Sequence, residues 1–162
     1  MKYLHMGEGF ARPHVPELVI NWHITEACNF SCRYCYAKWD GTEKELIHDW
    51  GRTQKLLDEI ASFFAPGNLS NPLAQALSWS ALRLNLAGGE PLLYPETALR
   101  VLAHARSLGM NTSIITNGSR LSDDLVVQIA PLVSMIGISI DSGLADTNLR
   151  IGRVNSRGAL LN

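Results

Sequence analysis

Cys28, Cys32 and Cys35 are the only cysteines in this 162-residue chain, and they lie together in one short stretch. The stretch follows a predicted strand at residues 18–25, where apolar and polar residues alternate. Three soft thiol ligands on one loop are typical of an iron–sulfur cluster or of zinc, and an odd number of cysteines argues against a disulfide framework. A four-iron cluster normally binds four thiolates, so three thiolates would leave one iron open for chemistry.

A zinc site with three cysteines and one histidine, His23, is the alternative that the spacing leaves open. A second motif helps to choose between the two. Gly-Gly-Glu-Pro at residues 88–91 follows the predicted strand 82–87. The two glycines let the backbone approach a ligand closely, and the Glu90 carboxylate can accept a hydrogen bond from an ammonium group. Alone, Gly-Gly-Glu is more often a turn. Its position one βα unit after the cysteine loop makes the two motifs together a strong indication of a ligand site.

The Cys-x3-Cys-x2-Cys pattern, with an aromatic residue before its last cysteine and Gly-Gly-Glu-Pro further on, resembles the radical S-adenosylmethionine (SAM) superfamily. The resemblance implies a 4Fe-4S cluster held by the three cysteines, with SAM bound at the open iron and cleaved to a 5'-deoxyadenosyl radical. It also implies SAM contacts, and the matching positions are Tyr34, Gly88, Gly89, Glu90, Asn117 and Ser139. For Asn117 the alternative is a simple turn, because asparagine before glycine is a common turn pair.

The rest of the chain is expected to alternate between strands and helices. Strands are predicted at residues 18–25, 82–87, 111–116 and 135–141, with no strand afterwards. Helices are predicted at 49–65, from Pro95 to Gly109 and after the N-cap residue Ser122, with a short helix around 73–77. Such alternation gives right-handed crossovers and a parallel sheet, so the predicted fold class is α/β.

Three of the predicted strands have one aliphatic and one polar face. The polar residues are Asn21, His23, Arg83, Asn85, Ser139 and Asp141. Strands of a parallel sheet are usually apolar on both faces, so a polar inner face favours a wide, curved barrel segment lined for a polar ligand. The resemblance implies a radical SAM partial TIM barrel, with about four of its six βα units present. The alternative is that these strands border solvent on one side.

Bulk composition is that of one ordinary globular domain, with 46% hydrophobic and 18% charged residues. A formal net charge of -1 gives no electrostatic reason to expect nucleic-acid or membrane-surface binding. Residues 1–12 hold no apolar run long enough for a signal peptide or a transmembrane helix. Free cysteines without a targeting segment predict a reducing, cytoplasmic location.

Four longer stretches resemble the viperin family, especially its prokaryotic members. They are Asn-Trp-His-Ile-Thr-Glu-x-Cys-Asn at 21–29, Asn-Leu-Ala-Gly-Gly-Glu-Pro at 85–91, Ser-Ile-Ile-Thr-Asn-Gly-Ser at 113–119 and Asn-Leu-Arg-Ile-Gly-Arg at 148–153. The resemblance implies an antiviral enzyme that converts a nucleoside triphosphate, such as CTP, to its 3'-deoxy-3',4'-didehydro form. Hydrogen abstraction from the ribose C4' and loss of the 3'-hydroxyl as water would be its steps.

The same resemblance implies nucleotide contacts at Asn21, His23, Arg83 and Arg153, and an electron donor of the flavodoxin or ferredoxin type. Arg83 stands where the family has lysine, which keeps the charge and changes the geometry toward a bidentate fork. The alternative for Arg153 is a solvated surface arginine, and for His23 a satisfied inner histidine. Ala87 stands where animal viperins have serine.

Residues 1–162 are expected to form a single radical SAM core domain that is truncated at its C-terminus, because the resemblance implies two further βα units. The open edge of the last strand should then self-associate, or pair with a second polypeptide or the missing half. Two rival functions stay open at this point. One is another radical SAM activity on a peptide or small metabolite, and the other is a catalytically silent fragment that binds only the cluster and SAM.

Overall fold

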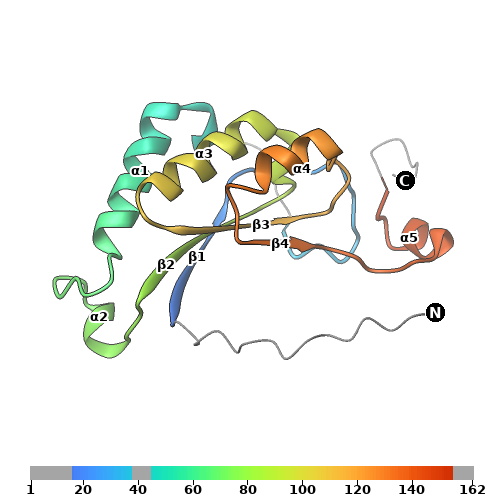
Figure 1. Ribbon diagram of the computed structural model, residues 1–162. Coiled ribbons are helices and arrows are strands. Elements are labelled where there is room, and N and C mark those ends of the chain that lie inside the picture. The colour runs from blue at the N-terminus through green and yellow to red at the C-terminus, as the bar shows by residue number, and fades with distance from the viewer. Residues whose placement is uncertain (1–15, 38–44, 155–162) are drawn as a thin grey trace, which may run out of the picture.

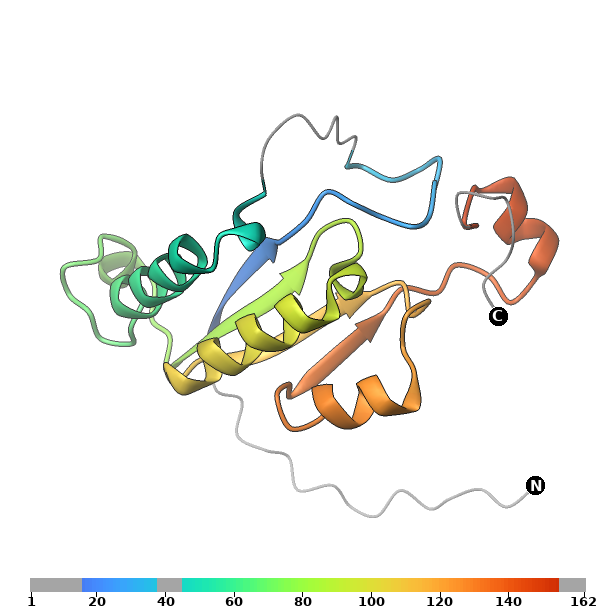
Figure 2. The same cartoon turned by 90° about the horizontal axis from the view of Figure 1, so that it is seen from above.

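Four parallel strands form one sheet in the order β1-β2-β3-β4 in the computed structural model, which describes residues 16–37 and 45–154. Helices α1, α3 and α4 lie on the same side of this sheet (Figure 1), and the view from above shows them running along the strands (Figure 2). The strands are β1 Glu17–His23, β2 Ala81–Ala87, β3 Asn111–Thr116 and β4 Met135–Ile138. The helices are η1 Leu46–His48, α1 Trp50–Phe63, α2 Leu73–Ala76, η2 Pro91–Leu93, α3 Pro95–Ser107, α4 Asp123–Ile129 and α5 Ala145–Arg150.

The helix boundaries follow the capping signals in the sequence. The Asp49 side chain accepts a hydrogen bond from the Arg52 backbone N–H at 3.1 Å and starts α1. Ser122 does the same for α4, accepting from the Leu125 N–H at 3.3 Å. Helix α3 begins at a proline, and the following Gly109 adopts a φ of +83°, a left-handed conformation that favours glycine.

The core lies between the helix layer and the aliphatic face of the sheet. Leu84 and Leu86 of β2 and Ile114 of β3 are fully buried there, against Leu57 of α1 and Leu102 of α3. Burying one such side chain contributes about 1.5–3 kcal/mol, so this layer supplies a large part of the folding free energy. The predicted α/β fold with parallel strands is confirmed.

The opposite face of the sheet carries a ladder of polar side chains, as its alternation predicted. Ser113 Oγ donates to Asn85 Oδ1 at 2.7 Å, and Asn85 Nδ2 donates to Asn21 Oδ1 at 2.8 Å. One rung nearer the amino ends of the strands, Arg83 forms a bidentate ion pair with Glu17. These bonds satisfy polar groups that would otherwise be costly to bury.

Two of the strands and α-helices differ from the sequence prediction by more than two residues. Strand β4 ends at Ile138 and not at Asp141, because the chain leaves the sheet there after a last backbone bond from Ser139 N to Thr116 O. The segment after β4, for which no strand was expected, holds the short helix α5. Figure 1 shows α5 beyond the carboxyl end of β4 and apart from the layer formed by α1, α3 and α4. No helix among the described residues is long and apolar enough to cross a membrane.

Candidate functional site

A cavity of about 510 Å³ opens at the carboxyl ends of the strands, where parallel α/β folds keep their active sites. All three cysteines line it, together with most of the site residues predicted from the sequence. The predicted residues are Asn21, His23, Tyr34, Gly88, Gly89, Asn117, Ser139 and Arg153. The cavity is also lined by Phe30, Tyr36, Ala87, Ile115, Thr116 and Asp141.

Gly88 and Gly89 let the loop after β2 lie directly against the segment that leads to the first cysteine. Gly89 N donates to Thr25 O and Glu90 N to Ala27 O, each at 2.8 Å. A Cβ on Gly89 would overlap the Ala27 carbonyl, and Gly88 combines a φ of +132° with a Cβ position 2.5 Å from Thr25 O. The sequence predicted these glycines for close approach to a ligand. In the structure they permit close approach of two backbone segments, which fixes the start of the cysteine loop.

The other side of the cysteine loop is held by the end of α5. Arg33 N donates to Ile151 O at 2.9 Å, and Ser31 N donates to Gly152 O at 3.2 Å. Gly152 has a φ of +78°, and a Cβ there would overlap the Ser31 carbonyl. The loop is therefore clamped between the Gly-Gly-Glu segment and residues 151–152.

Arg153 follows this clamp and joins three segments around the cavity. Its guanidinium pairs with Asp141 at 2.5 Å, donates to the backbone oxygen of Ser139 and lies 3.3 Å from Asn117 O. Its Cζ also lies 5.2 Å from the centre of the Phe30 ring, a cation–π contact. The Arg153 side chain is only 11% exposed, so it is not a solvated surface arginine.

Electrostatics affect two groups beside the cavity. Desolvation raises the pKa of Tyr34 above its ordinary value, and hydrogen bonds with Asp141 and Cys32 raise it further, while Arg153 opposes them. The phenol is thus neutral at physiological pH. Partial burial also raises the pKa of the Cys28 thiol, so an iron ion that binds its thiolate must displace a proton.

The donor set of the cavity fits a cluster. Three soft sulfur ligands face one space, and two N–H groups point at Cys28 Sγ, the Phe30 backbone at 3.4 Å and the Asn117 side chain at 3.9 Å. Such N–H contacts to sulfur are among the features that tune iron–sulfur clusters. In the part of the chain that the structure describes, no three or more His, Cys, Asp or Glu side chains are gathered closely enough to hold a metal ion. His23, the proposed fourth zinc ligand, has its Nε2 3.3 Å from the Tyr36 hydroxyl.

Two predicted site residues do not line the cavity. Arg83 donates through Nε and Nη2 to Glu17 at 2.7 and 3.0 Å, nearer the amino ends of the strands. Glu90 is fully buried beside the cavity wall, and its carboxylate accepts three hydrogen bonds from the protein itself. Both charged groups bind partners within the protein. Residue type and the order of motifs along the chain could not reveal these partners.

Sequence reasoning also missed two aromatic residues of the cavity, Phe30 and Tyr36. Both lie in the cysteine loop, and Tyr36 is 81% exposed. The signal that could have found them is an aromatic residue within two positions of a cysteine. A short loop around a cluster has no core of its own in which to bury such a ring.

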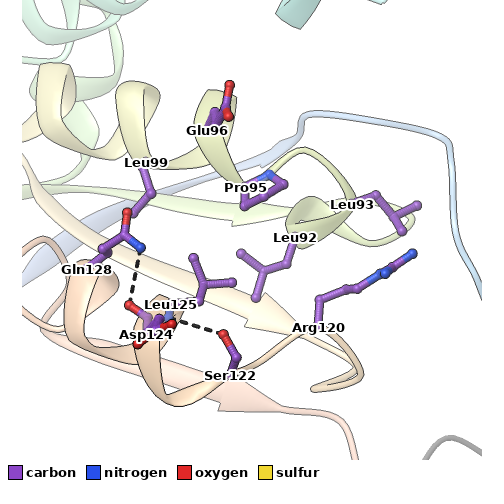
Figure 3. A pocket seen from close by; sticks show the side chains of 10 residues that line it. All are labelled: Leu92, Leu93, Pro95, Glu96, Leu99, Arg120, Ser122, Asp124, Leu125 and Gln128. Carbon is purple, nitrogen blue, oxygen red and sulfur yellow. Dashed lines mark hydrogen bonds between the residues drawn. The ribbon is translucent and has the colours of Figure 1, made fainter.

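A second cavity, of about 520 Å³, lies on the helix side of the molecule between η2, α3 and α4. Figure 3 shows Leu92 and Leu125 pointing toward each other in it, with Arg120 at one side. None of the predicted site residues lines this second cavity.

Comparison with known proteins identifies relatives at the sequence level. S-adenosylmethionine-dependent nucleotide dehydratases from Psychrobacter lutiphocae and Pseudoalteromonas ulvae are 43% and 40% identical over 89% and 91% of this chain. An Fe-coproporphyrin III synthase from Methanosarcina barkeri is 31% identical over 80% of this chain and 28% of its own length. This chain spans about half the length of the two dehydratases, 47% in each case.

At the level of the fold, the solved structure of native anSMEcpe with bound AdoMet is similar to this chain with a TM-score of 0.58. It shares 17% sequence identity and matches 90% of this chain and 37% of that one, so it supports the fold alone. The profile of the Radical SAM superfamily matches residues 22–161. Because that match includes the cysteine loop and the strand-end segments around the cavity, this chain belongs to the radical SAM superfamily.

Proposed function

We propose that this chain is part of a nucleotide dehydratase that removes water from a nucleoside triphosphate, such as CTP, to give the 3'-deoxy-3',4'-didehydro analogue. The sequence identity of 43% and 40% to two nucleotide dehydratases is the observation that supports this proposal. The wider role in this proposal is antiviral defence in the cytoplasm, with a flavodoxin- or ferredoxin-type electron donor. The activity is that of a lyase, because water leaves the ribose without hydrolysis.

Superfamily membership brings two cofactors, a 4Fe-4S cluster and SAM, which when bound supply the one-electron chemistry that abstracts a hydrogen atom. Cys28, Cys32 and Cys35 would hold the cluster. Backbone groups of Gly88 and Gly89, with Tyr34, Asn117 and Ser139, line the same cavity and would bind SAM.

Asn21 and His23 lie on the cavity side of β1 and would meet the nucleotide. Asn21 Oδ1 already accepts from Asn85, so a ligand would meet the Asn21 amino group, which donates. A donor at this place suits a hydroxyl or phosphate oxygen. The His23 ring packs edge-on against Tyr36, with centroids 6.0 Å apart, which orients both rings at the cavity mouth.

The phosphates need more positive charge than the described residues bring to the cavity. Arg153 is the one arginine or lysine among the lining residues that the structure describes, and it is paired with Asp141. Arg83, predicted as a second phosphate contact, is paired with Glu17 outside the lining. We therefore assign phosphate binding to Arg153 together with cations from a further segment or a second polypeptide. The dehydratase relatives, about twice as long as this chain, are consistent with that assignment.

A different radical SAM reaction is the second candidate, because an Fe-coproporphyrin III synthase is also among the relatives. A substrate screen separates the two. The reconstituted chain would be incubated anaerobically with SAM, dithionite and each common ribonucleoside triphosphate, with 5'-deoxyadenosine and nucleotide masses as readouts. We expect one triphosphate to stimulate the formation of 5'-deoxyadenosine. When that triphosphate carries deuterium at C4', the deuterium should appear in the 5'-deoxyadenosine.

Controls keep the outcomes of this screen distinct. Cys32→Ala should abolish 5'-deoxyadenosine formation, and a 3'-deoxynucleotide should give no product lighter by one water. Formation of 5'-deoxyadenosine that no triphosphate stimulates would favour the second candidate. If intact chain with a full cluster formed none under any condition, the silent cluster-binding fragment would be the better description.

A further inference from the structure

Glu90 is an ionisable side chain with no exposed surface, although it belongs to the Gly-Gly-Glu-Pro motif beside the cavity. Its Oε1 accepts from Leu92 N at 2.9 Å and from Thr116 Oγ1 at 2.7 Å, and its Oε2 accepts from Asn117 N at 2.7 Å. A buried carboxylate is tolerated when donors from the protein satisfy it, and each of these bonds is charge-assisted. The carboxylate therefore ties the loop after β2 to the end of β3.

Asn117, which receives this support, is the centre of a small closed network. Its side-chain Nδ2 donates to Asn29 Oδ1 at 2.9 Å, Asn29 Nδ2 donates to Ser119 Oγ at 2.8 Å, and Ser119 N donates back to Asn117 Oδ1 at 2.9 Å. Asn29 directly follows the first cysteine, so the network fixes the backbone at that ligand. The same Nδ2 lies 3.9 Å from Cys28 Sγ.

We propose that Glu90 is a positioning residue that acts on Cys28 through Asn117, and that it does not bind the ammonium group of SAM. The backbone N–H of Asn117 is held by Glu90, and the side chain of Asn117 is thereby aimed at Asn29 and the Cys28 sulfur. Glu90 does not line the cavity, whereas Asn117 does. The inference rests on superfamily membership and not on the proposed nucleotide reaction, so either can fail alone.

The two roles for Glu90 differ in what they predict before SAM is added. Hydrogen bonds to cluster sulfurs influence the reduction potential, because an N–H donor stabilises the more negative, reduced state. If Glu90 holds Asn117 on Cys28, moving the carboxylate changes the cluster without SAM. If Glu90 is a SAM ligand, the reduction potential of the SAM-free cluster should stay at the wild-type value.

The test uses the anaerobically reconstituted chain and compares Glu90→Asp, Asn117→Ala and the double variant. Glu90→Asp keeps the charge and withdraws the carboxylate by one methylene. The SAM-free reduction potential would be measured by an EPR-monitored redox titration, and SAM affinity by equilibrium binding. Glu96→Asp, which changes an exposed glutamate just after the motif, is the matched control.

We expect Glu90→Asp and Asn117→Ala each to lower the SAM-free potential, with no further shift in the double variant, because the two residues act in series. A SAM-free potential that Glu90→Asp leaves at the wild-type value, with only SAM affinity reduced, would overturn the proposal. Additive shifts in the double variant would also overturn it, since Glu90 would then act independently of Asn117.

Thr116→Val keeps the inference testable if Glu90→Asp fails to fold or to hold iron. This change removes one donor from the Glu90 carboxylate and leaves the carboxylate itself in place. A shift of the SAM-free potential in the same direction as Asn117→Ala supports positioning. An unchanged SAM-free potential in Thr116→Val contradicts it.

Discussion

Arg83 and Glu17 form a two-point ion pair across neighbouring strands, with Arg83 Nε 2.7 Å and Nη2 3.0 Å from the two carboxylate oxygens. Their side chains are 13% and 23% exposed, so solvent screens the pair only partly. Ser134 Oγ accepts from the same guanidinium at 2.7 Å, and Asn111 Nδ2 donates to Glu17. The Arg83 guanidinium therefore links neighbouring strands, and its donors are already used by partners within the protein.

The first prediction contrasts the two arginines. Arg83→Ala should lower the free energy of unfolding by about 1–3 kcal/mol, because it leaves Glu17 partly buried without its main partner. Arg153→Ala should instead weaken nucleotide binding, and this loss should shrink as salt rises. Thermal unfolding and nucleotide titrations at two salt concentrations would measure both effects. A larger loss of nucleotide affinity in Arg83→Ala, with unfolding unchanged, would return Arg83 to the phosphate site.

The second prediction concerns the cluster. Anaerobically purified protein should be brown and contain iron and sulfide, and Cys32→Ala should lose both, because two thiolates cannot hold the cluster. Iron and acid-labile sulfide assays with the visible spectrum are the measurement. Colourless protein with one equivalent of zinc would show that the metal assignment is wrong.

The third prediction concerns backbone contact at the Gly-Gly pair. Gly89→Ala should prevent cluster assembly, since its Cβ would overlap the Ala27 carbonyl and push the cysteine loop away. Gly143→Ala is the control, because a Cβ there meets no atom within 4 Å. Iron content and thermal unfolding should separate the two variants. A Gly89→Ala protein with full iron content would mean that the loop can shift without losing its ligands.

The fourth prediction concerns the polar ladder. Ser113 is buried and does not line the cavity, yet its hydroxyl holds Asn85, which holds Asn21. Ser113→Ala should therefore weaken nucleotide binding and destabilise the fold by about 1 kcal/mol, the usual contribution of one hydrogen bond. Ser62→Ala, on the exposed side of α1, should change neither. Unaltered nucleotide affinity in Ser113→Ala would separate the ladder from ligand binding.

The fifth prediction concerns strand β4, which pairs only with β3 among the described residues. Its Met135 and Ile138 are 57% and 51% exposed, and the following Ile140 is 78% exposed. An open strand edge with exposed apolar side chains favours association, so light scattering should detect oligomers of the isolated chain. Ile138→Lys should reduce them. A monodisperse monomer at high concentration would contradict this expectation.

Much of the fold follows from local sequence patterns. The alternation at β2, the helix expected at 49–65 and the N-cap residue Ser122 gave these elements within a few residues of their observed limits. Helix α5 was missed because it is short and has no buried residue, so it leaves no apolar period to recognise. Its position depends on contacts with the cysteine loop, far away in the sequence, and local propensity cannot encode such contacts.

The candidate site was predictable where residue type alone fixes the chemistry, as with the three cysteines. It was less predictable where a charge has two possible uses. Glu90 and Arg83 are each satisfied by partners that become neighbours only in the folded chain, Asn117 for one and Glu17 for the other. The order of the motifs indicates that such residues have a role. Only the folded geometry shows whether the side chain stabilises the protein or is available to a ligand.

The backbone bonds from Arg33 to Ile151 and from Ser31 to Gly152 have a consequence for synthesis on the ribosome. Cys32 leaves the exit tunnel before residues 88–90 emerge and long before residues 151–152 exist, so both clamps of the nascent loop form only later. The iron–sulfur assembly machinery would meet an unfinished loop during that interval. Stable metallation should therefore be a late event, and ribosome-stalled chains that stop before α5 should acquire little iron.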